Sequence, residues 1–263
     1  MTSRREKKSG RRQAAAMIVL EGVAKRYGET VALHGIDVTM AAGHVHTILG
    51  ENGSGKSTLV KLLSGVVRPD QGRILLEGRP VALSDPTTAR RHGIATVFQE
   101  VLLAPSRTVL DNIFLGYDGL WARRLPLHRR REAAETLLAW FARSMPDLSA
   151  RGGEVPLAQQ QLVVLARALV RKPRILILDE VTAALDVADR DVLFDALREF
   201  VADGRLVVFI SHRLDEVRRL SDRVTVLRNG RAVETLERGQ VNSERLLQLM
   251  IPDAHLRVHA AHA

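Results

Sequence analysis

The sequence predicts an α/β protein whose core is a mostly parallel sheet flanked by helices, with an N-terminal antiparallel β subdomain and an inserted helical subdomain. Apolar segments at 93–98, 174–179 and 205–211 are separated by helical stretches, which is typical of a mostly parallel sheet. Residues 17–49 read as short alternating strands interrupted by glycine, which indicates an antiparallel sheet leading into a buried strand. Residues 100–172 are mainly helical in pattern and divided by four prolines, which predicts the inserted lobe.

The C-terminal part of the chain is expected to close the fold with a hairpin and a short helix. Residues 223–236 contain Asn229-Gly230, a pair typical of a two-residue β-hairpin. Residues 243–250 predict a closing helix capped by Ser243.

We assign residues 17–252 to a single domain, with the helical subdomain at about 100–172, and residues 1–16 and 253–263 to tails. The N-terminal tail carries much of the net charge of +9, because residues 1–13 hold six Arg or Lys and one Glu. Such a run could contact anionic lipid or nucleic acid, but a solvated, disordered extension is the simpler interpretation. We expect no nucleic-acid partner.

The composition excludes several kinds of chemistry and placement. The chain has no cysteine, which excludes disulfides, thiol nucleophiles and cysteine-ligated metals. No apolar run approaches the roughly 18 to 20 residues that span a bilayer, and no apolar stretch follows the basic start closely enough to form a secretory signal. We therefore expect a cytoplasmic location.

Residues 50–58, GENGSGKST, match the pattern of a phosphate-binding loop and lie between an apolar strand and a helical stretch, as that loop requires. Glycines allow successive N–H groups to turn around phosphate oxygens, Lys56 reaches the β and γ phosphates, and the Ser57 hydroxyl ligates Mg²⁺. A glycine-rich turn with an incidental lysine is the alternative. The sequence thus predicts a P-loop NTPase core, with nucleotide contacts from Gly50, Asn52, Gly53, Ser54, Gly55, Lys56, Ser57 and Thr58.

A second acidic element follows the apolar run 174–178, which leaves Asp179 and Glu180 at the carboxyl end of a strand, where α/β sheets place ligands. We expect Asp179 to hold Mg²⁺ through water and Glu180 to polarise an attacking water as general base. Taken alone, such a pair is more often a helix cap. Its combination with the phosphate loop favours catalysis.

Three further side chains are weaker candidates. Gln99 and His212 each follow a predicted core strand and could face the γ phosphate, although each alone could be an ordinary structural residue. Tyr27 precedes the phosphate loop and could stack on a base, although a strand-edge aromatic is equally plausible.

The order of these elements resembles that of the ATP-binding-cassette (ABC) ATPases, from about Met17 to Ile251. Seven family motifs are matched in order. Tyr27 matches the adenine platform, Gly50–Thr58 the phosphate loop, Gln99 the Gln loop and Val155–Gln159 the signature. Asp179–Glu180 match the acidic strand end, Ala184–Asp186 the Ala-Leu-Asp loop and His212 the switch histidine. The resemblance implies ATP and Mg²⁺ as cofactors, with Gln99 as a further Mg²⁺ ligand, and a dimer that encloses two ATP molecules. It also implies nucleotide contacts by Pro156, Ala158, Gln159 and Asp186.

Within this family, the segments GENGSGKSTLVKLLSGV, GIATVFQE, DNIFLG and SHRLDEV look most like the ATPase subunits of bacterial ribose- and xylose-type importers. The resemblance implies a membrane permease, a second ATPase subunit and a periplasmic or lipid-anchored sugar-binding protein as partners, and a peripheral position on the cytoplasmic face of the cell membrane. The alternatives are a cassette with impaired hydrolysis that supports a partner cassette, or a soluble ABC ATPase acting on ribosomes or nucleic acid.

Two positions depart from the family pattern. Val181 stands where the residue after the catalytic glutamate is usually proline. Residues 155–159, Val-Pro-Leu-Ala-Gln, stand where Leu-Ser-Gly-Gly-Gln or a sugar-type variant is expected. Pro156 has neither a hydroxyl nor a backbone N–H, and Ala158 has a Cβ where glycine would let the backbone approach phosphate. We therefore expect this loop to be impaired in contacting the phosphates of ATP.

Overall fold

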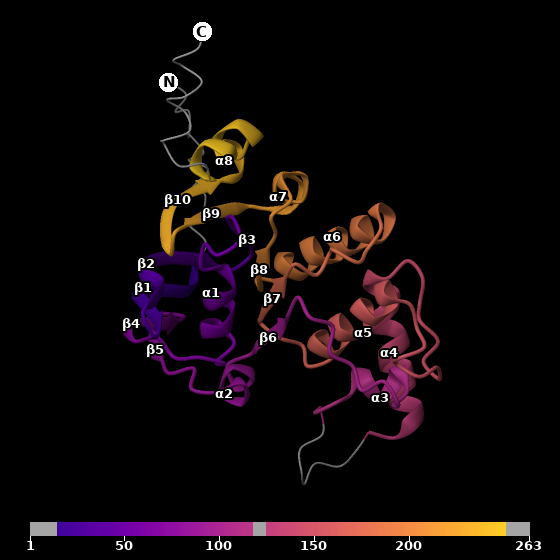
Figure 1. The fold of residues 1–263 in the computed structure, drawn as a ribbon. Coiled ribbons are helices and arrows are strands. Elements are labelled where there is room, and N and C mark those ends of the chain that lie inside the picture. The colour runs from indigo at the N-terminus through magenta and orange to yellow at the C-terminus, as the bar shows by residue number, and fades with distance from the viewer. Residues whose placement is uncertain (1–14, 118–124, 251–263) are drawn as a thin grey trace, which may run out of the picture.

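A six-stranded sheet forms the centre of the fold, and the computed structural model that contains it describes residues 15–117 and 125–250 (Figure 1). The strand order is β10-β9-β3-β8-β7-β6, and all pairs are parallel except β10 with β9. Every residue of the three central strands is buried, which is why β7 and β8 read as nearly continuous apolar runs, whereas β3 also buries His46 and Thr47. The strands are β3 (Val45–Leu49), β6 (Ile94–Val97), β7 (Ile175–Asp179), β8 (Leu206–Ile210), β9 (Arg223–Arg228) and β10 (Arg231–Glu237).

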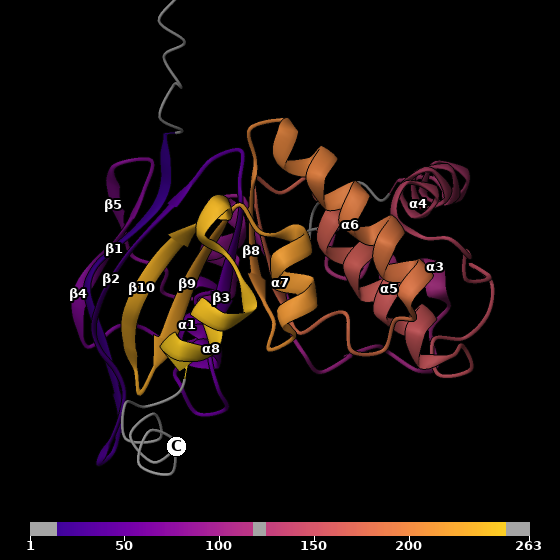
Figure 2. The same cartoon turned by 90° about the horizontal axis from the view of Figure 1, so that it is seen from above.

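A four-stranded antiparallel sheet of order β2-β1-β4-β5 lies on one side of the central sheet, with α1 (Lys56–Leu63) packed between the two (Figures 1 and 2). Its strands are β1 (Ala16–Tyr27), β2 (Thr30–Ala41), β4 (Gln71–Leu76) and β5 (Arg79–Val81). The sequence predicted the first two strands but not the second two. The short helix α2 (Pro86–Arg91) follows, capped by Asp85.

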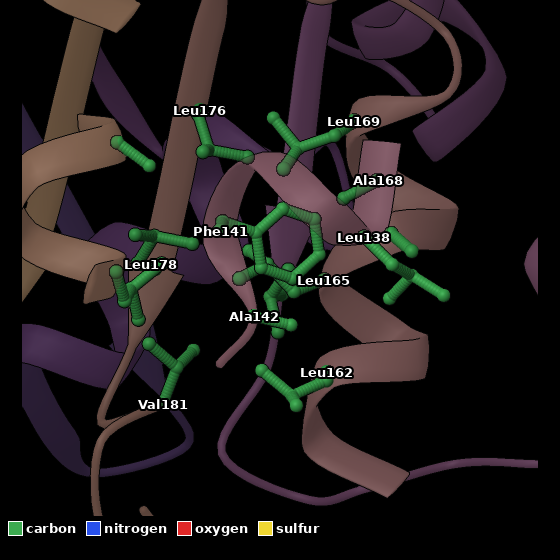
Figure 3. Packing of buried hydrophobic residues seen from close by; sticks show 14 of the residues in the cluster. Leu138, Phe141, Ala142, Leu162, Leu165, Ala168, Leu169, Leu176, Leu178 and Val181 are labelled. Atoms are coloured by element: carbon green, nitrogen blue, oxygen red, sulfur yellow. The ribbon is translucent and has the colours of Figure 1, made fainter. Parts of the chain in front are cut away.

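Helices cover the other side of the central sheet (Figure 2). They are α3 (Val109–Ile113), α4 (Leu127–Phe141), α5 (Leu157–Leu169) and α6 (Val187–Ala202). Figure 3 shows the fully buried Phe141 of α4 among side chains from α5 and β7, including Leu165 and Leu178. The predicted fold class is confirmed: an α/β core with an antiparallel β part and a helical part inserted between β6 and β7.

The C-terminal elements are α7 (Leu214–Leu220), the β9–β10 hairpin, a 3₁₀ turn (Arg238–Gln240) and α8 (Ser243–Met250). Asn229 and Gly230 both have positive φ, of 49° and 69°, as the predicted two-residue turn requires. The predicted cap of α8 is wrong by one residue. Asn242, not Ser243, accepts the Arg245 amide at 2.8 Å through its side-chain oxygen.

The predicted tails at 1–16 and 253–263 lie almost entirely outside the described residues, so they remain predictions. Among residues 15–117 and 125–250, no helix has both the length and the apolar character needed to cross a bilayer.

Candidate functional site

The loop from Gly50 to Gly55 joins β3 to α1 and wraps around the side chain of Lys56. Lys56 Nζ donates to the carbonyl oxygens of Gly50 at 2.7 Å and Glu51 at 2.8 Å. The residue is only 6% exposed, and burial lowers the pKa of Lys56, while the carboxylates of Glu180 and Asp179 oppose that shift. The loop therefore holds a positive charge at the amino end of α1, where the helix dipole also favours an anion.

Bare backbone is required at two positions of this loop. A Cβ on Gly50 would lie 2.3 Å from the Leu227 carbonyl oxygen and 2.5 Å from Ser54 Oγ. Gly55 has φ of 106°, and a Cβ there would lie 2.8 Å from the Ala32 carbonyl oxygen. The glycines of the motif thus allow the loop to fold tightly against neighbouring backbone.

A cavity of about 830 Å³ opens above the loop. The lining includes most of the predicted nucleotide and catalytic residues together with several others: Thr30, Val31, Ala32, Gly50, Glu51, Asn52, Gly53, Gly55, Lys56, Ser57, Thr58, Gln99, Glu180, His212 and Met250. Ser54 belongs to the same loop but does not line the cavity, and its buried hydroxyl has no hydrogen-bond partner among the residues that the structure describes. The volume is ample for a nucleotide.

Asp179 and Glu180 lie at the carboxyl end of β7, as predicted. Burial, with the neighbouring Glu180 carboxylate, raises the pKa of Asp179 to about 6, and the Lys56 ammonium partly offsets this. Glu180 has a left-handed φ of 51°, and its amide donates to the Ile210 carbonyl oxygen at 3.1 Å. Such a conformation is strained for a non-glycine residue and is held by its surroundings.

Gln99 and His212 converge on Glu180 from the two strands that flank β7. Gln99 Nε2 lies 3.4 Å from Glu180 Oε2, and His212 Nδ1 lies 3.1 Å from Glu180 Oε1. Two residues that are weak candidates individually are therefore next to the proposed general base.

Besides Ser54, five of the predicted nucleotide contacts lie outside the lining of this cavity. Tyr27 is 44% exposed, and the Lys25 ammonium lies 5.7 Å from the centre of its ring. Asp186 caps α6, accepting the Asp189 amide at 2.7 Å. The other three, which begin α5 on the helical side of the molecule, are Pro156, Ala158 and Gln159.

Sequence reasoning missed part of the cavity wall, which is formed by Thr30, Val31 and Ala32 of β2 and by Met250 of α8. The sequence signal for the three β2 residues is that they follow Tyr27 closely, because β2 begins at Thr30. Met250 carries no local signal, because its position depends on how α8 packs.

The residues at this site fit a magnesium nucleotide. Ser57 and Gln99 line the cavity, and Asp179 ends β7 just outside the lining; their hydroxyl, amide and carboxylate oxygens are donors of the kind that Mg²⁺ prefers. The glycine loop is closed to any added Cβ at Gly50, and Lys56 provides the cation for phosphate oxygens.

Three features together define a P-loop NTPase. They are the glycine loop with its buried lysine, the acidic strand end, and the glutamine and histidine that converge on it. A family profile described as ABC transporter matches residues 33–183, more than half of the chain, and the chain belongs to this family. The resemblance stated from the motifs is thereby confirmed.

Curated relatives carry one recurring name. The ribose import ATP-binding protein RbsA 1 of Rhizobium johnstonii is 43% identical over 232 residues, which are 88% of this chain and 45% of that protein. The protein of the same name from Burkholderia thailandensis is 42% identical over 238 residues, 89% of this chain and 46% of that protein. The chain thus spans about half the length of the curated relatives it matches.

Solved structures agree on the fold. A nucleotide-free ATP-binding cassette from an ABC transporter aligns with a TM-score of 0.77 and 25% identity over 90% of this chain and 100% of that chain. A dimeric cassette in a post-hydrolysis state, bound to ADP and Pi, aligns with a TM-score of 0.75 and 27% identity over 84% and 98%.

Proposed function

We propose that this chain binds MgATP in the cavity above the phosphate loop and hydrolyses it as the ATPase subunit of an importer for a monosaccharide. The observation that carries the ATPase proposal is that buried Lys56 lines the same cavity as the cluster of Glu180, Gln99 and His212. The monosaccharide proposal rests on the relatives named as ribose import ATP-binding proteins.

Each side chain has a distinct role in this proposal. Lys56 contacts the β and γ phosphates, and the loop amides hold their oxygens. Ser57, Asp179 and Gln99 would hold Mg²⁺, which when bound supplies positive charge for the phosphate oxygens. Their oxygen donors fit that ion.

Hydrolysis needs a base beside the γ phosphate. Glu180 accepts the proton of the attacking water at a carboxylate oxygen, and its contacts with His212 at 3.1 Å and Gln99 at 3.4 Å orient that carboxylate. His212 is 54% exposed at its side chain, so it is accessible to the γ phosphate from the cavity.

The partners follow from the same proposal. A membrane permease, a second ATPase subunit and a periplasmic or lipid-anchored sugar-binding protein complete the importer, and the chain works on the cytoplasmic face of the cell membrane. The dimeric cassette among the structural neighbours supports a two-subunit arrangement.

A second candidate function is a cassette that binds ATP but hydrolyses it slowly in support of a partner. The start of α5 favours it, because Pro156 occupies the cap position without a side-chain cap hydrogen bond and Leu157 is 59% exposed beside it. A facing nucleotide would meet neither a hydroxyl nor an N–H at Pro156.

The test of the ATPase proposal is Lys56→Ala, compared with Lys61→Ala as a control on the same helix. Loss of charge-assisted contacts to phosphate should weaken ATP binding roughly 10- to 150-fold, since such a bond is worth about 1.5 to 3 kcal/mol. Lys61 is exposed and outside the cavity lining, so its variant should bind and hydrolyse ATP like the parent. Calorimetric titration measures the ATP affinity of each variant, and phosphate release measures its hydrolysis rate. Unchanged affinity in Lys56→Ala contradicts the assignment.

A further inference from the structure

Glu216 is a buried carboxylate that takes no direct part in the proposed hydrolysis. It occupies the first turn of α7, is 1% exposed and does not line the nucleotide cavity. A buried carboxylate is costly unless hydrogen-bond donors surround it. The donors around Glu216 therefore indicate what the residue organises.

Two hydroxyls and two guanidinium groups donate to Glu216. Oε2 accepts from Ser211 Oγ at 2.7 Å and from Thr182 Oγ1 at 2.9 Å. Oε1 accepts from Arg190 Nη1 at 3.1 Å and, at a longer 3.5 Å, from Arg213 Nη1.

These donors come from the chain segments that carry the catalytic side chains. Thr182 is two residues beyond Glu180, in the turn closed by the bond from the Ala183 amide to the Glu180 carbonyl oxygen. Ser211 and Arg213 flank His212, and Ser211 Oγ also accepts the Arg213 amide at 3.0 Å.

Arg190 adds a third segment. It lies one turn into α6, and its amide donates to the carbonyl oxygen of Asp186 at 3.1 Å. Glu216 thus links the turn after β7, the turn after β8 and the start of α6.

We propose that Glu216 is a positioning residue for ATP hydrolysis, which fixes the turn carrying Glu180 relative to the turn carrying His212. This inference rests on the proposed ATPase function. His212 Nδ1 and Glu180 Oε1 are 3.1 Å apart, so a shift of either turn alters the orientation of the general base. Glu216 touches neither side chain in the hydrogen bonds of the structure, and it acts through Thr182, Ser211 and Arg213.

The test uses Glu216→Gln and Glu216→Ala in the full chain. The glutamine keeps the shape but loses the charge that faces two arginines, and it presents an NH₂ group to one pair of donors. Ser221→Ala is the matched control, because Ser221 ends the same helix and its hydroxyl bonds Thr47 Oγ1 at 2.6 Å in a buried pair that includes neither Glu180 nor His212.

Steady-state kinetics should separate positioning from stability. Glu216→Gln should lower kcat roughly 10- to 100-fold, the scale expected when catalytic groups move by about 1 Å. The KM for ATP and the nucleotide affinity should stay near those of the parent, because the phosphate loop is untouched. Ser221→Ala should lower the melting temperature without changing kcat. A kcat in Glu216→Gln equal to that of the control overturns the proposal.

Hydrogen exchange provides a second measurement that does not require ATPase activity. If Glu216→Ala does not fold, Glu216→Gln alone is used for the test. Amides of residues 180–185 and 211–214 should exchange faster in Glu216→Gln than in the parent and in Ser221→Ala. Unchanged exchange in both segments overturns the proposal. If the parent binds ATP but does not hydrolyse it, the proposed ATPase function is wrong. Hydrogen exchange still shows in that case whether Glu216 holds the two turns in place.

Discussion

Replacing Asp179 by asparagine should stabilise the nucleotide-free protein at neutral pH. Asp179 is 7% exposed, and burial with the adjacent Glu180 carboxylate raises the pKa of Asp179 from 3.8 to about 6. The folded state binds this proton more tightly than the unfolded chain, so the stability from this group is fully present below the unfolded pKa and is lost as the pH rises through about 6. Because the pKa of Asp179 rises from 3.8 to about 6, the ionised group destabilises the fold by about 3 kcal/mol at pH 7.5.

Thermal melting at several pH values tests this reasoning. At pH 7.5, Asp179→Asn should melt about 6 °C or more above the parent. The gain should fall to about 1.5 kcal/mol at pH 5 and to about 0.5 kcal/mol at pH 4, where the carboxyl is protonated in the folded state. A variant that melts at or below the parent temperature at pH 7.5, or a gain that is the same at pH 4, refutes the assignment of a buried, ionised carboxylate at Asp179.

Added nucleotide should reduce the stability advantage of Asp179→Asn over the parent. Saturating MgATP stabilises only the state that binds it, so the parent should gain more than Asp179→Asn if Asp179 helps to hold Mg²⁺. Equal gains would show that Asp179 takes no part in metal binding.

Two further predictions concern turnover. Glu180→Gln should keep ATP affinity and lower kcat roughly 10²- to 10⁴-fold, which is the contribution of a general base. Phosphate release with a parallel binding titration checks this, and parent-like turnover would exclude Glu180 as the base. Pro156→Ser combined with Ala158→Gly should raise kcat roughly 10- to 150-fold by restoring a charge-assisted hydrogen bond of about 1.5 to 3 kcal/mol to a facing nucleotide. An importer-like rate in the unrepaired parent, with no gain on repair, would show that the loop is a working variant.

The phosphate loop was predictable from sequence because its chemistry is local. Glycines at 50 and 55, the lysine at 56 and the flanking strand and helix are all set within a dozen residues, and the structure shows Lys56 enclosed by its own loop. The hairpin at Asn229-Gly230 was predictable for the same reason, because only the two central residues need positive φ.

Features that depend on tertiary packing were missed. Strands β4 and β5 are short, and the first half of β4 and most of β5 are exposed and polar or proline, so they lack the sustained apolar signal of the central strands. The cap of α8 was predicted one residue late because Asn242 and Ser243 are both good caps, and sequence alone does not decide between neighbours. The partners of Glu216 come from three separated segments, so no spacing rule could bring them together.

Gln99 and His212 lie between these two cases. Each follows the end of a strand by one or two residues, which sequence indicates, but an amide or imidazole at such a position is usually structural. The order β8-β7-β6 brings both residues to the predicted site, because it puts the strand that leads to Glu180 between the strands that lead to His212 and Gln99. Carboxyl ends of adjacent parallel strands share one edge, and strands lie about 5 Å apart, so the three side chains come within reach of one another without any local sequence relationship. The sequence supplied the chemistry at each strand end, and the strand order, which no local pattern encodes, makes the three ends into one site.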